Sequence, residues 1–488
     1  MREQLKGLTR DSAIYGVGHI ASRLITFLLL PYYSYHLTPA EYGEITLYFL
    51  FVAIAQAFYY YGLDIAYLRY FTLAKEPEAR RIVTGTTLLS SVISSLVLSI
   101  IIILGATSLG RLVVHIPTHP EIVGTMIRLG AGILFFDTLA TFPFLLLRGT
   151  MRPFHFALTK LFNVAVNLVL NIWFVGGLGL SIEGIMWANF IASGLTFLVL
   201  LPVLVGHIRI GFDRKTIGDM IVFGIPNVPT YLFVMIIELA DRKVIEIYRG
   251  LQEAGLYSAG YKLGMFMAVV TGAFRFAWQP FFLSHSERPD APRLFARVLT
   301  YYLIVTTFLF LFMTFFADFF VKTRWPGIGC LLEPRFWPGL AVFPIILLAH
   351  IFDGVYANLM VGVYLKKLTA RLPLVTGVAA GFTIVFNILL VPTIGMMAAA
   401  WITLIAFAME AVLLWLVVRK AYPVPYEWLR IGKLSAAVAV VFAIAMLPPW
   451  TSIWWRALML VTLPAVLYLM RFFDESELHF LRTAMKRS

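Results

Sequence analysis

The segment Ser12–Ser34 reads SAIYGVGHIASRLITFLLLPYYS and places one arginine in the middle of a long, mostly apolar run. A membrane helix that begins near Ser12 would carry Arg23 roughly 16 Å deep, close to the centre of a hydrocarbon layer about 30 Å thick. A cation at that depth is costly and usually faces a watery cavity or a charged partner. Arg23 therefore predicts an internal polar space, with His19 on the same helix face. A structural ion pair, for which Asp137 is the candidate acid, is the alternative.

Composition places the whole chain in the membrane class, because 60% of the 488 residues are hydrophobic and only 13% are charged. We expect an all-α polytopic membrane protein whose first helix is retained and not cleaved as a signal. Its fourteen predicted transmembrane helices are 12–34, 42–62, 83–108, 122–147, 157–175, 182–206, 217–240, 256–276, 298–320, 338–364, 372–391, 395–418, 434–448 and 455–471.

The positive charges predict the orientation of these helices. With both termini inside, 28 of the 39 lysines and arginines fall in cytoplasmic segments or near the cytoplasmic ends of helices, and 8 fall in or near the outer segments. The other 3, Arg23, Arg128 and Lys262, lie deeper within helices. This is the bias of a cytoplasmic (inner) membrane protein with cytoplasmic termini. It also accounts for most of the net charge of +13, so no nucleic acid partner is expected.

A weak internal repeat divides the predicted helices into two sets. Short matches recur at an offset of 208 to 216 residues, among them Glu41-Tyr42-Gly43 with Glu253-Ala254-Gly255 and Asn171-Ile172 with Asn387-Ile388. Six helices per copy would relate the copies by an axis along the membrane normal. We therefore predict two pseudo-symmetric six-helix lobes, residues 1–211 and 212–420, followed by two additional C-terminal helices and a cytoplasmic tail in residues 421–488.

Polar residues inside the N-terminal lobe form a second group of candidates. Lys160, Asn163, Asn167 and Asn171 follow each other by three or four residues, which aligns them on one helix face. Such a stripe either lines a cavity or makes hydrogen bonds between helices, and the spacing alone leaves both open. Asp137 is placed near the membrane centre and is a further candidate for the cavity.

The C-terminal lobe carries its own ionisable residues at membrane depth. His350, Asp353 and Glu410 lie well inside apolar helices and are candidates for coupling transport to an ion or proton gradient. A polar contact between packed helices is the alternative, above all for His350. Lys262 is flanked by apolar residues and, with Arg275 on the same predicted helix, is a candidate cavity cation.

Signals for enzyme chemistry are missing from the sequence. It contains no phosphate-binding Gly-x-x-x-x-Gly-Lys-Ser/Thr loop, no nucleophile elbow and no zinc-protease motif. We therefore expect a transporter and not an enzyme, with no cofactor and no metal site.

Three short features together resemble a known family: Leu37-Thr38-Pro39-Ala40-Glu41-Tyr42-Gly43 after the first helix, Arg69 after the second, and Glu253-Ala254-Gly255-Leu256-Tyr257 opening the eighth. With the fourteen helices, they are similar to the lipid-linked oligosaccharide flippases, the O-antigen and exopolysaccharide transporters of the multidrug/oligosaccharidyl-lipid/polysaccharide exporter superfamily.

The resemblance implies a V-shaped pair of lobes that open alternately to each side of the membrane. It also implies cavity cations that bind the pyrophosphate of a polyprenyl-linked sugar, at Arg23, Arg69 and Lys262 or Arg275. The implied partners are the lipid-linked oligosaccharide, membrane lipids, a polysaccharide polymerase and other glycan-assembly proteins. The implied process is the synthesis of a surface polysaccharide such as lipopolysaccharide O-antigen, capsule or exopolysaccharide.

Two other functions remain to be weighed. A cation-coupled multidrug exporter of the same superfamily would need acids in its cavity, whereas the first helix carries Arg23 and His19 but no acid. This favours an anionic substrate. A scaffold for glycan-assembly enzymes would leave Arg23 and the duplicated lobes unexplained.

The charge bias predicts the result of a topology experiment. Reporter fusions after Ser488 and within the segment 76–80 should both report a cytoplasmic location, because both positions border arginine-rich segments. A periplasmic signal from either fusion would contradict the predicted orientation.

Overall fold

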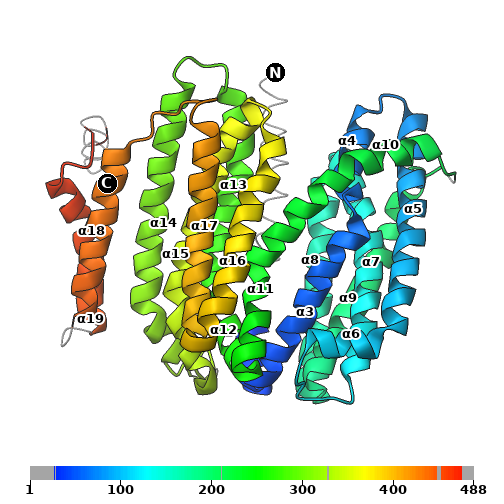
Figure 1. Cartoon of the computed structure of the whole chain (residues 1–488), viewed down its shortest axis with the longest axis horizontal. Coiled ribbons are helices and arrows are strands. Elements are labelled where there is room, and N and C mark those ends of the chain that lie inside the picture. Colours follow the sequence, from blue (N-terminus) through cyan, green and yellow to red (C-terminus); the bar gives the residue numbers. More distant parts are fainter. Residues whose placement is uncertain are drawn as a thin grey trace.

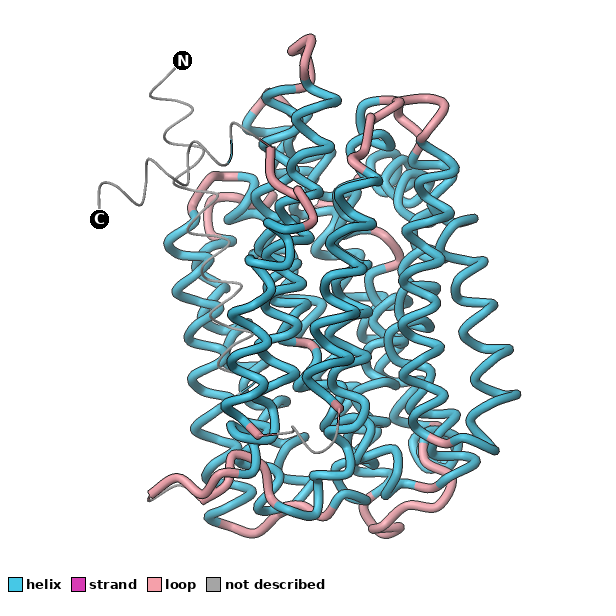
Figure 2. Tube along the Cα trace, turned by 90° about the vertical axis from the view of Figure 1, so that its left-hand side faces the viewer, coloured by secondary structure: helices cyan, strands magenta, loops and turns pink. Residues whose placement is uncertain are grey.

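The computed structural model describes Phe27, Glu477 and residues 29–209, 211–326, 329–447 and 452–474. Within these residues the chain is helical, with one isolated bridge between Trp325 and Gly329 and no strand (Figure 2). Twelve helices or joined helices are long and apolar enough to cross a membrane. With α2 (Leu29–His36), the described end of the first predicted helix, and the shorter α19 (Ile453–Leu469), they match the fourteen predicted spans. The predicted fold class is confirmed.

The N-terminal group of helices packs around α7 and α3. Its members are α3 (Pro39–Tyr60), α4 (Leu63–Leu73), α5 (Pro77–Leu104), α6 (Ala106–Val113), α7 (Val123–Gly149), α8 (Pro153–Asn171) and α9 (Ser181–Leu204). We call the face with the loop 74–76 the inner face, following the predicted topology, and the opposite face the outer face.

The C-terminal group has the same general plan, with two further helices at its edge. Its members are α11 (Val228–Arg249), α12 (Leu251–Gly264), α13 (Phe266–His285), α14 (Ala291–Lys322), α15 (Phe343–Leu365), α16 (Leu372–Ile394) and α17 (Met396–Val418). The added α18 (Trp428–Met446) and α19 lie beside α14, at the left of Figure 1.

The seventh spanning segment belongs to both groups. Its first part, α10 (Arg214–Gly224), packs Ile217 and Met220 against α4 and α5, whereas its second part, α11, packs against α16 and α12. A short turn at 225–227 that contains Pro226 separates the two parts. Figure 1 shows this segment crossing diagonally between the groups. The division at residue 211 stays a prediction.

The second spanning segment is broken opposite the break in the seventh. Tyr61 and Gly62 separate α3 from α4 and both have positive φ, 34° and 81°. A Cβ atom on Gly62 would collide with the backbone of Gly224, and one on Gly224 would collide with Gly62. Glycine at both positions therefore lets two broken helices touch backbone to backbone.

The two groups meet on the outer face through another pair of glycines. A Cβ atom on Gly43 of α3 would lie 2.8 Å from the Gly255 nitrogen, and one on Gly255 of α12 would lie 2.9 Å from the Gly43 nitrogen. Thr46 and Ser258 are hydrogen-bonded at 3.2 Å beside them. In each pair, the two residues are separated by 212 positions along the chain. Positions that the predicted repeat makes equivalent therefore touch each other, as residues do at a two-fold axis.

The quoted segment Leu37-Thr38-Pro39-Ala40-Glu41-Tyr42-Gly43 contains the N-terminal cap of α3. Thr38 is the N-cap, Pro39 occupies the first turn, and the Thr38 backbone N–H donates to the Glu41 carboxylate at 2.8 Å. The other Glu41 oxygen lies 3.2 Å from His119 Nε2 in the outer loop. This hydrogen bond, reinforced by Glu121, raises the pKa of His119 above its ordinary value. These hydrogen bonds hold the start of α3 in place on the outer face, where the two groups meet.

The close backbone contact at Gly255 predicts that adding one methyl group there destabilises the protein. Gly255→Ala should lower the free energy of unfolding in detergent by about 1–3 kcal/mol, because the added Cβ meets the Pro39 carbonyl and neither backbone can yield easily.

Gly381 of α16 is the matched control, since a Cβ atom there has open space around it. Gly381→Ala should be neutral or stabilise by up to about 1 kcal/mol through helix propensity. Equal effects of the two substitutions in a denaturant titration would show that the close approach at Gly255 is not a stability determinant.

Candidate functional site

An open cavity of about 640 Å³, here called the inner cleft, lies between α4 and the inner end of α7. The predicted cation Arg69 lines it together with Arg148, which lies in the last turn of α7. Both arginines are exposed. In the part of the chain that the structure describes, neither has a carboxylate within ion-pair distance, although Asp64 lines the same cleft. The cleft therefore offers two uncompensated cations.

Arg69 is positioned by packing and not by an acid. Its guanidinium carbon lies 4.1 Å from the ring centre of Phe223, which belongs to α10. A cation over an aromatic face is attracted electrostatically and keeps its N–H groups free at the edge. Arg148 was counted in the sequence only as part of the positive cytoplasmic loops. No pattern in the sequence indicated that Arg148 would line the same cleft as Arg69.

The remaining predicted cations differ in their surroundings. Arg23 and His19 lie outside the described residues. Lys262 is a partly buried residue of α12, two residues before this helix ends at Gly264, and no acid pairs with it among residues 29–209, 211–326 and 329–447. Arg275, in contrast, forms an ion pair with Asp353 at 2.5 Å. Arg275 is therefore compensated by an acid, whereas no ion pair is found for Lys262 in these ranges.

The coupling candidates of the C-terminal lobe are partly brought together. Glu410 of α17 is buried and interacts electrostatically with Asp353 and Arg275. Asp353 is 24% exposed and its partner Arg275 is 55% exposed. Glu410 also interacts electrostatically with Glu238 of α11, so the structure gathers three acids and one cation from four helices.

His350 lies one turn from Asp353 but has different neighbours. Its ring centre is 5.5 Å from that of Phe407 and 6.1 Å from that of Tyr261. The side chain is buried among these aromatic rings, which fits the packed-contact alternative better than a proton relay.

The polar stripe of α8 lines a cavity inside the N-terminal group. This polar cavity has a volume of about 230 Å³, and Asp137, Lys160, Asn163 and Asn167 all line it. Asn163 donates to Thr196 Oγ1 of α9 at 2.8 Å. Cavity lining and hydrogen bonding between helices, the two alternatives left open by the sequence, therefore occur together.

Within the polar cavity, Asp137 and Lys160 interact electrostatically, and Asp137 also accepts a hydrogen bond from Ser193. The Lys160 ammonium lies 4.2 Å from the ring centre of Phe144. A buried acid with a cation in the same cavity costs less than either alone. Lys160 is thus a cationic neighbour of Asp137 that was not predicted. Arg23, the other candidate partner of Asp137, lies outside the described residues.

Asn171, the last residue of the stripe, does not line the polar cavity. It is fully buried and accepts a hydrogen bond from the Tyr33 hydroxyl of α2 at 2.6 Å. Its amide donates to the Asn167 carbonyl at 2.8 Å. Asn171 therefore connects the first spanning segment to α8.

One buried charge pair was not predicted. Asp241 and Arg242 are neighbours on α11, their side chains are 0% and 7% exposed, and they are paired at 3.1 Å. The Tyr257 hydroxyl also donates to Asp241, and Arg242 stacks 4.3 Å from the Tyr261 ring centre. An acid within an apolar helix, as Asp241 is, could have indicated this buried pair from the sequence. The pair compensates itself and needs no ligand.

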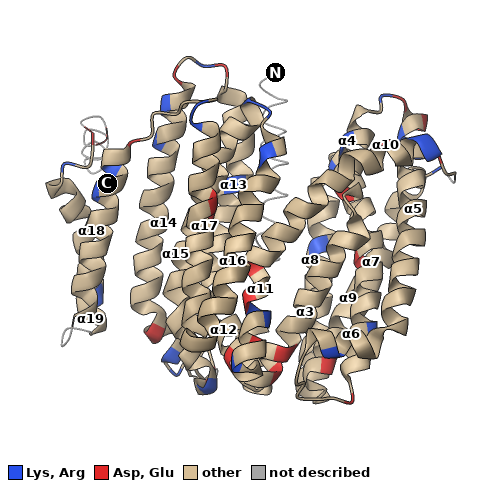
Figure 3. Cartoon of the chain, viewed as in Figure 1, with Lys and Arg blue, Asp and Glu red and all other residues tan. Residues whose placement is uncertain are grey.

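The charges and the opening of the inner cleft suit the binding of an anion. Uncompensated cations face the inner cleft, and the helix groups approach each other on the outer face and diverge toward the inner face (Figures 1 and 3). No group of three or more metal-ligating side chains is found in the described ranges. Such a site can hold and release a charged head group without breaking bonds.

Comparison with solved structures gives the same fold. The chain is similar to "Lipid II flippase MurJ, inward closed conformation", with a TM-score of 0.72 and 15% identity over 94% of this chain and 99% of that one. It is also similar to an inward-facing multidrug resistance MATE family transporter of the MOP superfamily, with a TM-score of 0.62 and 16% identity over 82% and 97% of the two chains.

A third similar structure is a mutant of the Vibrio cholerae MATE transporter VcmN, with a TM-score of 0.57 and 14% identity over 85% of this chain and 96% of that one. At these identities the structures show the shared fold alone. No curated protein matches the sequence.

A family model described as "Polysaccharide biosynthesis protein" matches residues 8–285, which is more than half of the chain. The resemblance predicted from the sequence is confirmed by this match together with the shared fold. The chain is a multi-pass membrane protein that belongs to the polysaccharide biosynthesis protein family.

Proposed function

We propose that this protein is a flippase that moves a polyprenyl-pyrophosphate-linked oligosaccharide across the cytoplasmic membrane by alternating access. The oligosaccharide would serve the synthesis of O-antigen, capsule or exopolysaccharide. A polymerase and other glycan-assembly proteins would receive it on the outer side. The pyrophosphate cannot cross hydrocarbon alone, and a cationic cavity lowers the cost of its transit.

The observation that carries the proposal is the pair Arg69 and Arg148 in the inner cleft. Both guanidinium groups are free of carboxylate partners among the described residues, and both can bind a phosphate through two parallel hydrogen bonds. An inner-facing cleft is where a substrate made on the cytoplasmic side would enter. Lys262 and Arg23 are proposed to contact the same head group deeper in the protein.

The packing of the two groups supports alternating access. The outer face is closed by backbone contact at Gly43 and Gly255, whereas the inner cleft is open. Opening the outer face requires this contact to separate. The breaks at Gly62 and Gly224 are the proposed hinges, because glycine tolerates the backbone change that such a motion needs.

A multidrug exporter is the second candidate, favoured by the similarity to MATE transporters and by Asp137 in the polar cavity. An acid there could hold a cationic drug or an ion. Lys160 in the same cavity opposes this role, because it already offsets the charge of Asp137 and repels a second cation. The anionic substrate is therefore preferred.

Energy coupling is proposed to involve the acids of the C-terminal lobe. Glu410 interacts with both Asp353 and Arg275, so a change in its protonation would alter the ion pair between them. Protonation of Glu410 would thereby affect the ion pair that connects α13 to α15. His350 is not included in this proposal.

Removing the cleft cations should impair transport of the lipid-linked oligosaccharide. In proteoliposomes with equal amounts of protein, Arg69→Ala and Arg148→Ala should each weaken substrate binding by about ten- to a hundredfold, since a hydrogen bond to a charged group contributes about 1.5–3 kcal/mol. Arg23→Ala should abolish flipping, whereas Arg23→Lys should retain part of it.

Arg214→Ala is the matched control, because Arg214 is an exposed arginine of the inner face that does not line the inner cleft. Its flipping rate should equal that of the wild type. Wild-type rates in the three alanine variants would refute the binding role. Export of cationic drugs with no flipping activity would establish the second candidate function instead.

The coupling role of Glu410 predicts a change in energy dependence. Glu410→Gln should flatten the dependence of flipping on an imposed proton gradient, because the amide cannot bind and release a proton. Asp219→Asn serves as the control, since Asp219 is exposed on α10. A variant Glu410→Gln with unchanged gradient dependence would assign Glu410 a structural role.

A further inference from the structure

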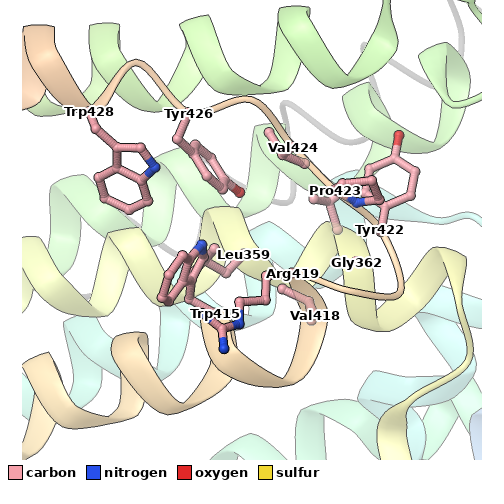
Figure 4. A pocket seen from close by; sticks show the side chains of 11 residues that line it. Leu359, Gly362, Trp415, Val418, Arg419, Tyr422, Pro423, Val424, Tyr426 and Trp428 are labelled. Carbon is pink, nitrogen blue, oxygen red and sulfur yellow. The ribbon is translucent and has the colours of Figure 1, made fainter.

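Two adjoining cavities lie away from the helix groups' mutual contact, between the C-terminal group and α18. The first, the apolar cavity, has about 240 Å³ and is lined by residues of α14, α15, α17 and α18. The second, the interfacial pocket, has about 130 Å³ and lies at the inner end of α17 (Figure 4). Four residues line both spaces: Leu359, Trp415, Tyr426 and Trp428.

The apolar cavity has the depth of one membrane leaflet. On α15 it is lined from Leu348 to Leu359, which corresponds to about 16 Å along the helix. This is roughly half of a hydrocarbon layer about 30 Å thick. Both α15 and α17 end at the inner face, and α14 and α18 begin there. The cavity therefore occupies the inner-leaflet half of the protein.

The interfacial pocket, at the inner end of the apolar cavity, has side chains suited to binding a lipid head group. The Arg419 guanidinium lies 4.9 Å from the ring centre of Trp415 and is exposed, with no ion pair to any acid of the described ranges. Trp428 is 5.7 Å from both Trp415 and Tyr426, measured between ring centres. Tryptophan and tyrosine favour the head-group level of a membrane, and arginine binds phosphate through two hydrogen bonds.

We propose that these cavities bind one phospholipid of the inner leaflet that carries an anionic head group. Its phosphate contacts Arg419 in the interfacial pocket, and one acyl chain fills the apolar cavity down to Leu348. An acyl chain in the cavity makes dispersion contacts with the side chains that line it. Because these side chains come from four helices, the bound chain holds α18 against α14, α15 and α17. The site lies apart from the inner cleft and does not depend on which substrate is transported.

Tryptophan fluorescence can test this site directly, because Trp415 and Trp428 line both cavities and bromine atoms on an acyl chain quench indoles that they touch. The full-length protein in detergent is titrated with phosphatidylglycerol brominated on its acyl chains, and in parallel with equally brominated phosphatidylcholine. Wild-type protein should show saturable quenching at about fivefold lower mole fraction of phosphatidylglycerol, as expected for one cation near a membrane surface.

Four variants identify the origin of this quenching. Trp415→Phe combined with Trp428→Phe should remove the saturable part, and Ala408→Phe, which fills the apolar cavity, should do the same while keeping both tryptophans. Arg419→Gln should abolish the preference for phosphatidylglycerol. Lys420→Gln, which alters the neighbouring exposed cation outside the pocket, should keep that preference.

Three results would overturn the proposal. The first is equal quenching of the wild type by both lipids, and the second is an unchanged preference in Arg419→Gln. The third is displacement of the brominated phosphatidylglycerol by an equimolar amount of polyprenyl phosphate, which would assign the cavity to the isoprenoid tail of the substrate. None of these readouts requires transport activity, so the test is separate from that of the flippase function.

Discussion

The contact of two helix backbones at Gly43 and Gly255 determines the overall shape of the protein. Because neither residue has a side chain, α3 and α12 approach on the outer face as closely as helices can. Helices that meet at one end and carry large side chains elsewhere must diverge toward the other end. The inner cleft lies within the N-terminal group, between α4 and the inner end of α7.

Charges inside the helices separate into compensated and uncompensated sets. Asp241 with Arg242, and Asp353 with Arg275, form ion pairs, and Asp137 shares a cavity with Lys160. Burying an ion costs several kcal/mol unless a partner offsets it. In these three cases the partner is another side chain of the protein, so no ligand is needed to account for the buried charge. Arg69 and Arg148 are exposed and have no carboxylate partner among the described residues, so they are available to an anionic ligand.

The sequence predicts single-helix properties well and contacts between helices poorly. The spacing of Lys160, Asn163 and Asn167 fixed their common face, and the structure places all three on one cavity because helical periodicity decides direction. The spacing could not show which of its two alternatives holds for Asn171, because its hydrogen-bond partner Tyr33 comes from another helix. Arg148 was missed for a similar reason, since a charge at a helix end looks like part of a loop until the neighbouring helix is placed.

The crossing of the seventh segment has a consequence for how the protein is made. Ile217 and Met220 cover apolar surface of α4 and α5, yet they follow all the other helices of the N-terminal group in the chain. During synthesis that group stays incompletely packed until α10 has left the ribosome. The following turn and α11 then emerge with α10 already anchored. The helices of the second group are therefore made after the segment that leads into them is already packed against the first group.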